Sequence, residues 1–417
     1  MRGSSALWLF LSTYALLYGA FGVQSPFVPT LLGERGLPTE DIGLVLAAAM
    51  VVRVLVGPLV SHAADRLRRH TLILCGCALF AALATISFLS ARNLAGLLCV
   101  ALLHATMLGP IAPITDALAS RGAQASRADC ARKFEYGWVR AAGSMAFALG
   151  TLAGGWQARA SGLAAAMWIS GGLLVLGGAV VLSLPKLAVT ESCARLRTTM
   201  LRDGLFLLRI PTYRRLLIAA SLLWGSHAMH DSFSVIRWRS AGIDFFTISA
   251  LWSESVFAEV VVFLLIGPWL VRRIGCSWSM TLATGAGVIR WGIAAFTTSP
   301  WLLACIQPMH GLTFALFHLA AIQLIVAVTP VRIAATAQAI YGTLCVGLVI
   351  ALLTGVSGLL YARVGGLAFL FMAALCLLAL PVCAGLRAPS EEPGALHGRH
   401  NTKSLHRGEP RDRKSVV

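Results

Sequence analysis

The chain has 417 residues, of which 58% are apolar and only 12% are charged. An ordinary soluble domain carries about 25% charged residues, and a soluble chain of this length could not cover its surface with so few. The composition therefore excludes a cytoplasmic enzyme and a nucleic-acid-binding module, although the formal net charge is +17. The apolar stretches are continuous rather than alternating, which indicates a polytopic helical membrane protein.

Twelve apolar stretches are long enough to cross a bilayer, at roughly 20 residues per span. They lie near residues 6–32, 40–62, 71–90, 95–120, 138–158, 163–184, 212–236, 247–271, 278–298, 301–328, 334–361 and 366–386. The longest polar interruption, from Pro185 to Pro211, divides them into six and six. We predict an all-α membrane protein with a six-helix bundle at 1–185, a linker at 186–211, a second bundle at 212–387 and a tail at 388–417. The tail is rich in Arg, His, Pro and Gly, which predicts disorder.

The basic residues are distributed unevenly about these spans. Most of the 34 Lys and Arg residues fall on the side that carries both termini and the 186–211 linker. The opposite loops hold only Arg35, Arg92, Arg159, Arg237, Arg239 and Arg363. By the positive-inside rule, we predict a multi-pass protein of the bacterial inner membrane with both termini in the cytoplasm. Binding to anionic lipid headgroups is a second use of the same charge.

A weak internal repeat relates the two halves. Gly57-Pro58 precedes Ala64-Asp65-Arg66-Leu67-Arg68 after the second span, and Gly267-Pro268 precedes Val271-Arg272-Arg273-Ile274-Gly275 after the eighth. Two six-helix halves joined by a basic cytoplasmic loop are the layout of a parallel-repeat transporter. No nucleotide-binding loop is visible, so we do not expect ATP to be the energy source.

The loop after the second span is similar to the signature G-x-x-x-D-R/K-x-G-R-K/R of the major facilitator superfamily. Asp65, Arg66 and Arg69 match the pattern, whereas Ser61 and Arg68 replace its two glycines. The resemblance implies the major facilitator fold, and a gating role for the three matching residues, which can clamp neighbouring helices in one state of the transport cycle. The alternative is a cytoplasmic anchor of positive charges.

Longer stretches, taken in order, resemble one branch of that superfamily, which is related to the proton-coupled lactose permease. They are Pro26-Phe27-Val28-Pro29, Pro113-Ile114-Thr115-Asp116-Ala117-Leu118-Ala119, Tyr136-Gly137-Trp138-Val139-Arg140-Ala141-Ala142-Gly143-Ser144, Ala258-Glu259-Val260, Val288-Ile289-Arg290-Trp291-Gly292, Met309-His310 and Phe317-His318-Leu319-Ala320-Ala321. The resemblance covers nearly the whole chain up to Arg387. It implies a secondary transporter that works by alternating access.

Ionisable side chains inside spans are costly, and they indicate function. Asp116 and Arg140 lie on adjacent antiparallel helices, where pairing would lower the cost of their burial. An Arg can also grip a carboxylate with two hydrogen bonds. The resemblance implies that Asp116 and Arg140 bind substrate, and Ser144 in the same stretch joins them as a candidate. The alternative for Asp116 and Arg140 is a purely structural ion pair.

The seventh span contains an H-x-x-H-D run, His227 to Asp231. A metal ion needs more ligands than this run supplies, and the ten Cys show no metal-binding spacing, so we predict no metal site. We expect His227 and Asp231 to line the substrate cavity, because their helix should flank it.

Candidates for proton coupling are Glu259, Arg290 and His310, on three successive helices of the second half. Burial in a dry cavity favours the neutral form of a carboxyl group, which lets it load and release protons near neutral pH. By resemblance, Arg290 and His310 match the Arg and His of the lactose permease's proton-translocation network. Glu259 is the first candidate for proton carrier and Glu254 the second. His318 is a further candidate, although a histidine hydrogen-bonded between helices is the alternative for both His310 and His318.

These features together predict proton symport of a small organic anion, driven by the proton gradient without a cofactor. We expect Arg140 and Arg290 to face the cavity from opposite halves, so that an anion can satisfy the Arg that Asp116 does not neutralise. Phe147, Trp252 and Trp291 could offer an apolar wall for a ring. An aromatic monocarboxylate such as 3-phenylpropionate fits, and the resemblance implies the same.

The expected partners are the substrate, protons and membrane lipids, for a monomer that binds no nucleic acid. The alternatives are the same fold with a sugar, nucleoside or drug as substrate, or a membrane-embedded enzyme, for which no nucleophile–base or metal constellation is visible.

Overall fold

The structure, a computed structural model, describes residues 3–128, 135–185 and 200–386. Most of the predicted linker and all of the predicted tail, 388–417, lie outside the described residues. Within the described ranges all regular structure is helical.

The first half contains eight helices. They are α1 (Gly3–Gln24), α2 (Val28–Glu34), α3 (Thr39–Leu67), α4 (His70–Ser87), α5 (Leu94–Leu108), α6 (Ile111–Ala128), α7 (Tyr136–Ser161) and α8 (Leu163–Leu182). The first predicted span is broken between α1 and α2, and Pro29 stands at the start of α2, where its missing N–H costs nothing. The fourth is broken between α5 and α6 at Gly109-Pro110.

The second half is more irregular. Its α-helices are α9 (Met200–Arg209), α10 (Pro211–Gly225), α11 (Ala228–Ser240), α12 (Phe245–Val261), α13 (Gly267–Phe296), α14 (Pro300–Ile306), α15 (Phe317–Val328), α16 (Ala334–Ile340), α17 (Ile350–Val364) and α18 (Phe369–Ala384). Three π-helical segments, η1 (Val262–Ile266), η2 (Gly311–Leu316) and η4 (Tyr341–Val349), and two 3₁₀ turns, η3 (Val331–Ile333) and η5 (Gly365–Ala368), lie between them. Wider π turns are frequent at functional sites.

Eight helical stretches among the described residues are long and apolar enough to cross a membrane. Two of them, Phe245–Phe296 and Val331–Ala384, hold two crossings each and are broken at Gly275 and Gly365. Positive φ values of 80° and 54° at these positions suit glycine, which has no Cβ to clash. The other two crossings are α7 and the pair α10–α11. The predicted multi-pass fold of twelve crossings in two six-helix bundles is therefore confirmed.

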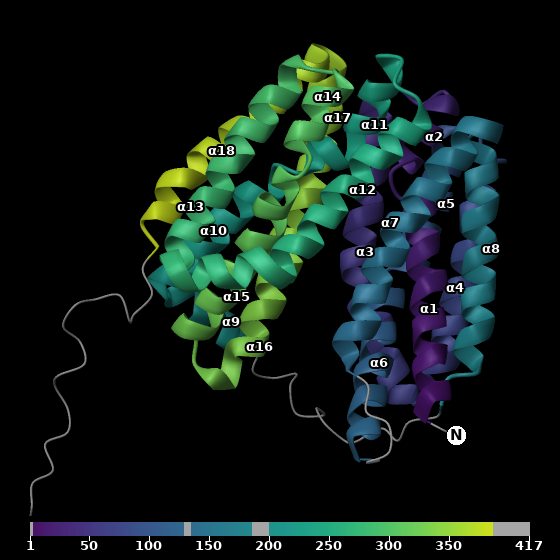
Figure 1. Ribbon diagram of the computed structural model, residues 1–417, viewed down its shortest axis with the longest axis horizontal. Coiled ribbons are helices and arrows are strands. Elements are labelled where there is room, and N and C mark those ends of the chain that lie inside the picture. The colour runs from purple at the N-terminus through teal and green to yellow at the C-terminus, as the bar shows by residue number, and fades with distance from the viewer. Residues whose placement is uncertain (1–2, 129–134, 186–199, 387–417) are drawn as a thin grey trace, which may run out of the picture.

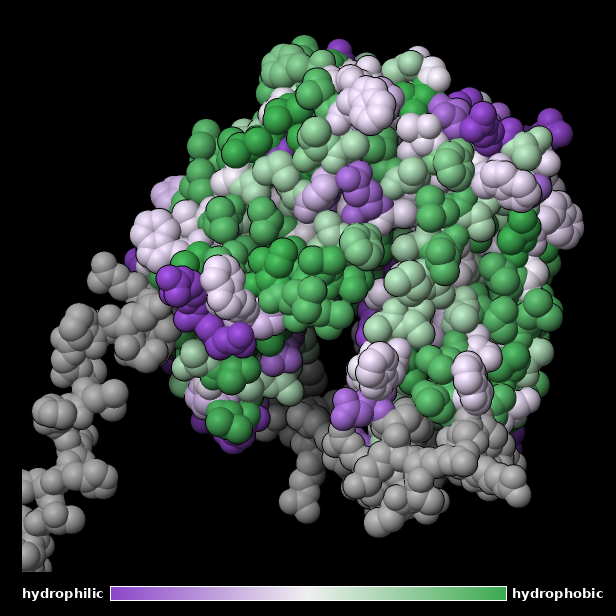
Figure 2. Space-filling model, in the orientation of Figure 1, coloured by the Kyte–Doolittle hydropathy of each residue, from purple (hydrophilic) through white to green (hydrophobic). Residues whose placement is uncertain are grey.

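Figure 1 shows the two bundles side by side, α1–α8 in one and α9–α18 in the other. They meet at the end of the molecule where α2, α11, α14 and α17 lie, and they separate toward α6, α9 and α16. Large apolar side chains such as Leu265, Trp301 and Leu377 are exposed on the outer surface, where apolar residues cover much of the view in Figure 2. That surface suits contact with lipid chains.

Glycine allows backbone to meet backbone at the closed end. A Cβ on Gly43 of α3 would lie 2.8 Å from the Cα of Gly358 of α17. A Cβ on Gly155 of α7 would lie 2.6 Å from the carbonyl oxygen of Phe245 of α12. Small residues at helix crossings are the usual means of close packing in membranes. The two halves are therefore locked together at this end in the conformation described.

Candidate functional site

A cavity of about 540 Å³ lies between the two halves. Its walls come from α1, α3, α5 and α7 on one side and from α10–α12, η2 and η4 on the other. Figure 2 shows the hollow between the halves on the side of α6 and α16. Pockets of about 300–1,000 Å³ hold small molecules. The cavity is therefore of the size for a small ligand and is reached from one end of the molecule.

The wall from the first half is basic. Arg53 of α3 and Arg140 of α7 line it, together with Ser144. The Arg140 guanidinium lies over the ring of Tyr18, 5.1 Å from its centroid, in a cation–π arrangement. The Arg53 side chain makes no hydrogen bond or ion pair with the described residues. This wall therefore presents positive charge to a ligand.

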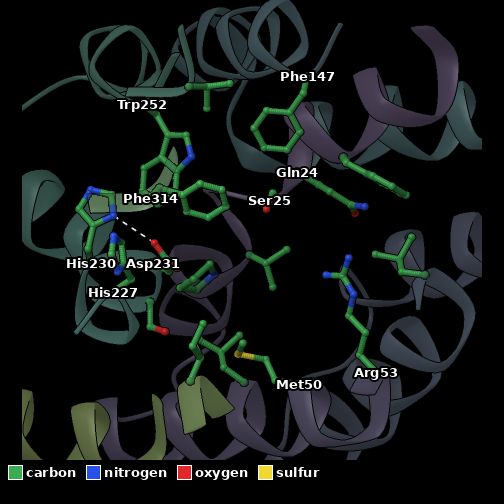
Figure 3. A pocket seen from close by; sticks show the side chains of 18 of the residues that line it. Gln24, Ser25, Met50, Arg53, Phe147, His227, His230, Asp231, Trp252 and Phe314 are labelled. Atoms are coloured by element: carbon green, nitrogen blue, oxygen red, sulfur yellow. Dashed lines mark hydrogen bonds and ion pairs between the residues drawn. The ribbon is translucent and has the colours of Figure 1, made fainter. Parts of the chain in front are cut away.

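The wall from the second half is acidic and rich in histidine. His227, His230, Asp231, Glu259 and His310 line it. Asp231 Oδ1 lies 3.1 Å from His230 Nδ1, the dashed line of Figure 3. His230 also stacks on Trp252 with ring centroids 4.8 Å apart. The predicted lining residues His227 and Asp231 therefore lie on the cavity wall, opposite Arg53 in the view of Figure 3.

A chain of contacts leads from the cavity into the second half. His310 Nδ1 lies 3.1 Å from Arg290 Nη1, and a guanidinium can only donate, so Nδ1 accepts. The neutral ring then carries its proton on Nε2, which faces Glu259 Oε2 at 3.6 Å. Arg290 Nη2 donates to Gln307 Oε1 at 3.0 Å. Glu259 is thus connected through His310 to a buried cation.

Arg290 does not face the cavity, contrary to the sequence-based expectation. Its side chain is fully buried, at 0% exposure, against Gln307, His310 and Thr313. No carboxylate of the described residues lies within 4.0 Å of it. The second cavity-lining arginine is instead Arg53, from the same half as Arg140.

Two other proton-coupling candidates also lie off the cavity wall. Trp252, Ser255 and Glu259 share the cavity face of α12, and Glu254 points from the opposite side of that helix. His318 lies one helix further along, 3.4 Å from the hydroxyl of Tyr341 through Nδ1. The arrangement at His318 matches the alternative of a histidine hydrogen-bonded between helices.

Asp116 and Arg140 do not form the predicted ion pair. No contact within 4.0 Å joins their charged atoms, although both belong to the described part of the chain. The Tyr14 hydroxyl donates to Asp116 Oδ1 at 2.5 Å instead, and Tyr14 stacks on Tyr18, whose ring carries the Arg140 guanidinium. Asp116 is therefore connected to Arg140 through two tyrosines, beside the cavity rather than in it.

The signature loop lies at the open end. Asp65 Oδ1 contacts His70 Nε2 at 2.7 Å and Arg121 Nη2 of α6 at 3.1 Å, whereas Arg66 and Arg69 are exposed. Arg68, which replaces a glycine of the pattern, has φ +53° and is the one non-glycine residue with positive φ in the described ranges. The Asp65 carboxylate thus links α3 to α4 and α6. Arg68 occupies a position where the backbone conformation favours the glycine of the family pattern.

Three residues line the cavity that the sequence did not assign to the substrate site. Arg53 is a charge inside the predicted span 40–62, but no sequence pattern indicates the direction of its side chain. Gln24 and Tyr18 line the cavity and carry no such signal. Among the described residues, no group of three His, Cys, Asp or Glu side chains could hold a metal ion.

A charged cavity between two six-helix halves of a multi-pass membrane protein defines a secondary transporter, whose substrate binds between the halves. The chain belongs to the MFS_1 like family of the major facilitator superfamily, whose model matches residues 7–373.

The chain is 32% identical over 380 residues to the probable 3-phenylpropionic acid transporter of Escherichia coli (strain K12), covering 90% of this chain and 96% of that one. It is 26% identical over 353 residues to the maltose permease of Geobacillus stearothermophilus, covering 84% and 86%. Its fold is similar to the crystal structure of the nucleoside transporter NupG, with a TM-score of 0.77 at 18% identity and coverage of 93% and 99%. The family and these relatives are transporters, not enzymes.

Proposed function

We propose that the protein is a proton symporter of the bacterial inner membrane that carries a small organic anion of the aromatic monocarboxylate class. The observation that supports this most directly is the division of the cavity. Arg53 and Arg140 line one wall, and Glu259 lines the other, next to His310. An anion suits the basic wall, and a protonatable acid that contacts a neutral histidine suits proton transfer.

The residues take the following roles in this proposal. Arg140, with Ser144 beside it, binds the carboxylate, and Asp116 positions Arg140 through Tyr14 and Tyr18. Glu259 carries the proton, and Arg290 keeps His310 neutral because a second positive charge beside a buried guanidinium is unfavourable.

In the same proposal, His227 and Asp231 contact the far end of the ligand, and the contacts of Asp65 with His70 and Arg121 form in the state that is open at this end. This end faces the cytoplasm, as the positive charges predict, and the transporter acts as a monomer without a cofactor.

The relative named for 3-phenylpropionic acid supports that ligand as the first to test. We expect labelled 3-phenylpropionate to accumulate in energised right-side-out vesicles and the accumulation to collapse on adding a protonophore. Because the neutral acid also crosses lipid by itself, vesicles without the protein give the background. If labelled phenylpropionate does not accumulate above that background, while labelled maltose, raffinose or a nucleoside does, the anion is replaced by another substrate of the same fold.

A further inference from the structure

The two walls of the cavity differ in which hydrogen-bonding groups they leave without partners. Figure 3 shows Arg53 and Gln24 on one side of the cavity and Asp231 with His230 on the other. Polar groups that become buried are nearly always hydrogen-bonded, and a bound ligand would cover those that face the cavity. The groups on each side that lack a protein partner therefore indicate the chemistry that a bound ligand should supply there.

The first half leaves donors unpaired. Gln24 is 2% exposed, and its Oε1 lies 3.1 Å from Thr85 Oγ1 and 3.2 Å from His104 Nε2. Its Nε2 has no partner among the described residues, and neither has the buried hydroxyl of Tyr18. Arg53 lines the same wall with its guanidinium unpaired in the same part of the chain. Gln24, Tyr18 and Arg53 all line the cavity, and a carboxylate that reached these donors would accept hydrogen bonds from them.

The second half leaves an acceptor only partly paired. The Asp231 side chain is 50% exposed and accepts one contact, from His230. His230 Nε2 faces the Gln307 amide nitrogen at 3.5 Å, so Nε2 accepts and Nδ1 donates to Asp231. No Lys or Arg of the described residues lies within 4.0 Å of Asp231. A carboxylate with two oxygens has room for further donors, and a hydrocarbon placed against it would remove water without replacing the lost hydrogen bonds.

Aromatic side chains line the space between these two ends. Phe147 comes from the first half, and Trp252 and Phe314 come from the second. A ring between them would gain apolar contact and offset or edge-on aromatic contact. The cavity is thus arranged as a donor end, an aromatic middle and an acceptor end.

We propose that the transporter binds aromatic carboxylates that carry a hydrogen-bond donor at the end opposite the carboxylate. Arg53, Gln24 and Tyr18 join Arg140 in holding the carboxylate, and Asp231 holds the donor. The donor is a hydroxyl or an ammonium group. This inference rests on the proposed function and sharpens its substrate class, because an unsubstituted phenylpropionate satisfies only one end of the site.

The test is a set of ligands measured against a set of variants of the full-length protein in nanodiscs, by calorimetric titration. The ligands are 3-phenylpropionate, its amide, its three ring-hydroxylated forms (ortho, meta and para) and a para-aminomethyl form. For the wild type we expect at least one donor-bearing acid to bind about tenfold or more tightly than 3-phenylpropionate, the size of one hydrogen bond to a charged group. Comparing the hydroxylated ligands with the para-aminomethyl ligand shows which donor the site prefers.

The variants separate the two ends. Asp231→Asn should abolish the preference for the donor and keep the preference for acid over amide. Arg53→Gln and Gln24→Glu should reduce the preference for acid over amide and keep the preference for the donor. Glu40→Gln and Arg92→Gln, which change exposed residues that do not line the cavity, are the charge-matched controls and should change neither preference.

Equal binding of all the acids by the wild type would overturn the inference, whether or not any variant folds. A donor preference that survives in Asp231→Asn would overturn the role of Asp231. If no carboxylate binds at all, while a sugar or nucleoside does, it is the proposed function that fails.

Discussion

The two halves share a fold and a weak repeat, but they bring opposite chemistry to the cavity. The first half presents Arg53 and Arg140, and the second presents Asp231 and Glu259 with three histidines. The first half is built of regular helices around its wall, whereas the second contains the π-helical segments η1, η2 and η4. The comparison teaches that the carboxylate of the substrate and the proton can be handled by different halves, so that each can be altered separately.

The repeat itself shows a second contrast. Arg68 after α3 and Gly275 within α13 each close the five-residue run that the repeat places after Gly-Pro, and both have positive φ, 53° and 80°. Both halves therefore end this helix with a residue of positive φ, although only one of them uses glycine there. Asp65, which contacts His70 and Arg121, stands opposite Arg272 when the two five-residue runs that end at Arg68 and Gly275 are aligned. The acid of the signature loop is thus a feature of the first half.

The largest effect on binding is expected at the basic wall. Arg140→Lys should weaken binding of 3-phenylpropionate by about 1.5–3 kcal/mol, because a point charge cannot reproduce the two-pronged grip on a carboxylate. The number of protons moved per substrate should not change, since the second half is intact. Titration gives the affinity, and Arg92→Lys is the control. Unchanged affinity, or a changed proton ratio, would break the division between the halves.

The next effect is expected at the junction of the halves. Gly43→Val adds side-chain atoms where even a Cβ lies 2.8 Å from Gly358 Cα. Overpacking costs about 1–3 kcal/mol, which shifts the population away from the conformation closed at this end.

The readout is labelling of a cysteine at Met50, on the cavity wall, by a membrane-impermeant reagent applied from each side. Exposed Cys99 and Cys305 set the background. Gly76→Val, where nothing lies within 4 Å of the added Cβ, is the matched control. Identical labelling patterns in the two variants would contradict a lock at Gly43.

A smaller effect is expected at Asp244, which begins α12 and lies 3.7 Å from Arg159 of the first half. Its carboxylate accepts hydrogen bonds from the Thr247 hydroxyl and from the backbone N–H groups of Phe246 and Thr247, which hold its pKa below the ordinary value. Asp244→Ala should lower the free energy of unfolding by about 1 kcal/mol, because the helix loses its N-cap.

The pH dependence follows from the lowered pKa. Stabilisation by Asp244 is fully present above its ordinary pKa of 3.8 and is lost as the pH falls through the lower folded value. Thermal unfolding of wild type and variant should therefore differ at neutral pH and converge in strong acid. A difference that grows in acid would be inconsistent with this assignment.

The smallest effect is expected at Arg68. A non-glycine residue in the left-handed region costs roughly 1–2 kcal/mol, and glycine recovers part of that while it adds disorder to the unfolded chain. Arg68→Gly, which makes the first half match Gly275 of the second, should raise the unfolding temperature slightly. A clear decrease would mean that contacts of the Arg68 side chain outweigh its backbone strain.

The fold followed from the sequence because the apolar runs are long and the charges sit on one side of them. The sequence did not predict which way the side chains within a span point. The sequence ranked Glu259 before Glu254 as the proton carrier but could not show which of them faces the cavity. Only Glu259 shares a helix face with Trp252 and Ser255. Arg290 was expected in the cavity and is buried against Gln307 and His310.

The π-helical segments explain part of this difficulty. A turn of the i→i+5 type changes the facing of every residue after it, so a regular helical wheel misplaces residues beyond it. His310 directly precedes η2 and His318 follows it, and only His310 lines the cavity. Gln24 and Tyr18 were not predicted to line the cavity for a different reason. They are uncharged polar residues within a span, and nothing in the sequence shows that their donor groups lack a hydrogen-bond partner.

The most direct test of the division of labour measures proton movement in proteoliposomes with a trapped pH dye, driven by a gradient of 3-phenylpropionate. Protein-free liposomes give the passive entry of the neutral acid. The account predicts that Glu259→Gln exchanges labelled substrate across the membrane but moves no protons above this background, while Glu254→Gln behaves as the wild type. Proton movement that persists in Glu259→Gln, or an equal loss in Glu254→Gln, would contradict it.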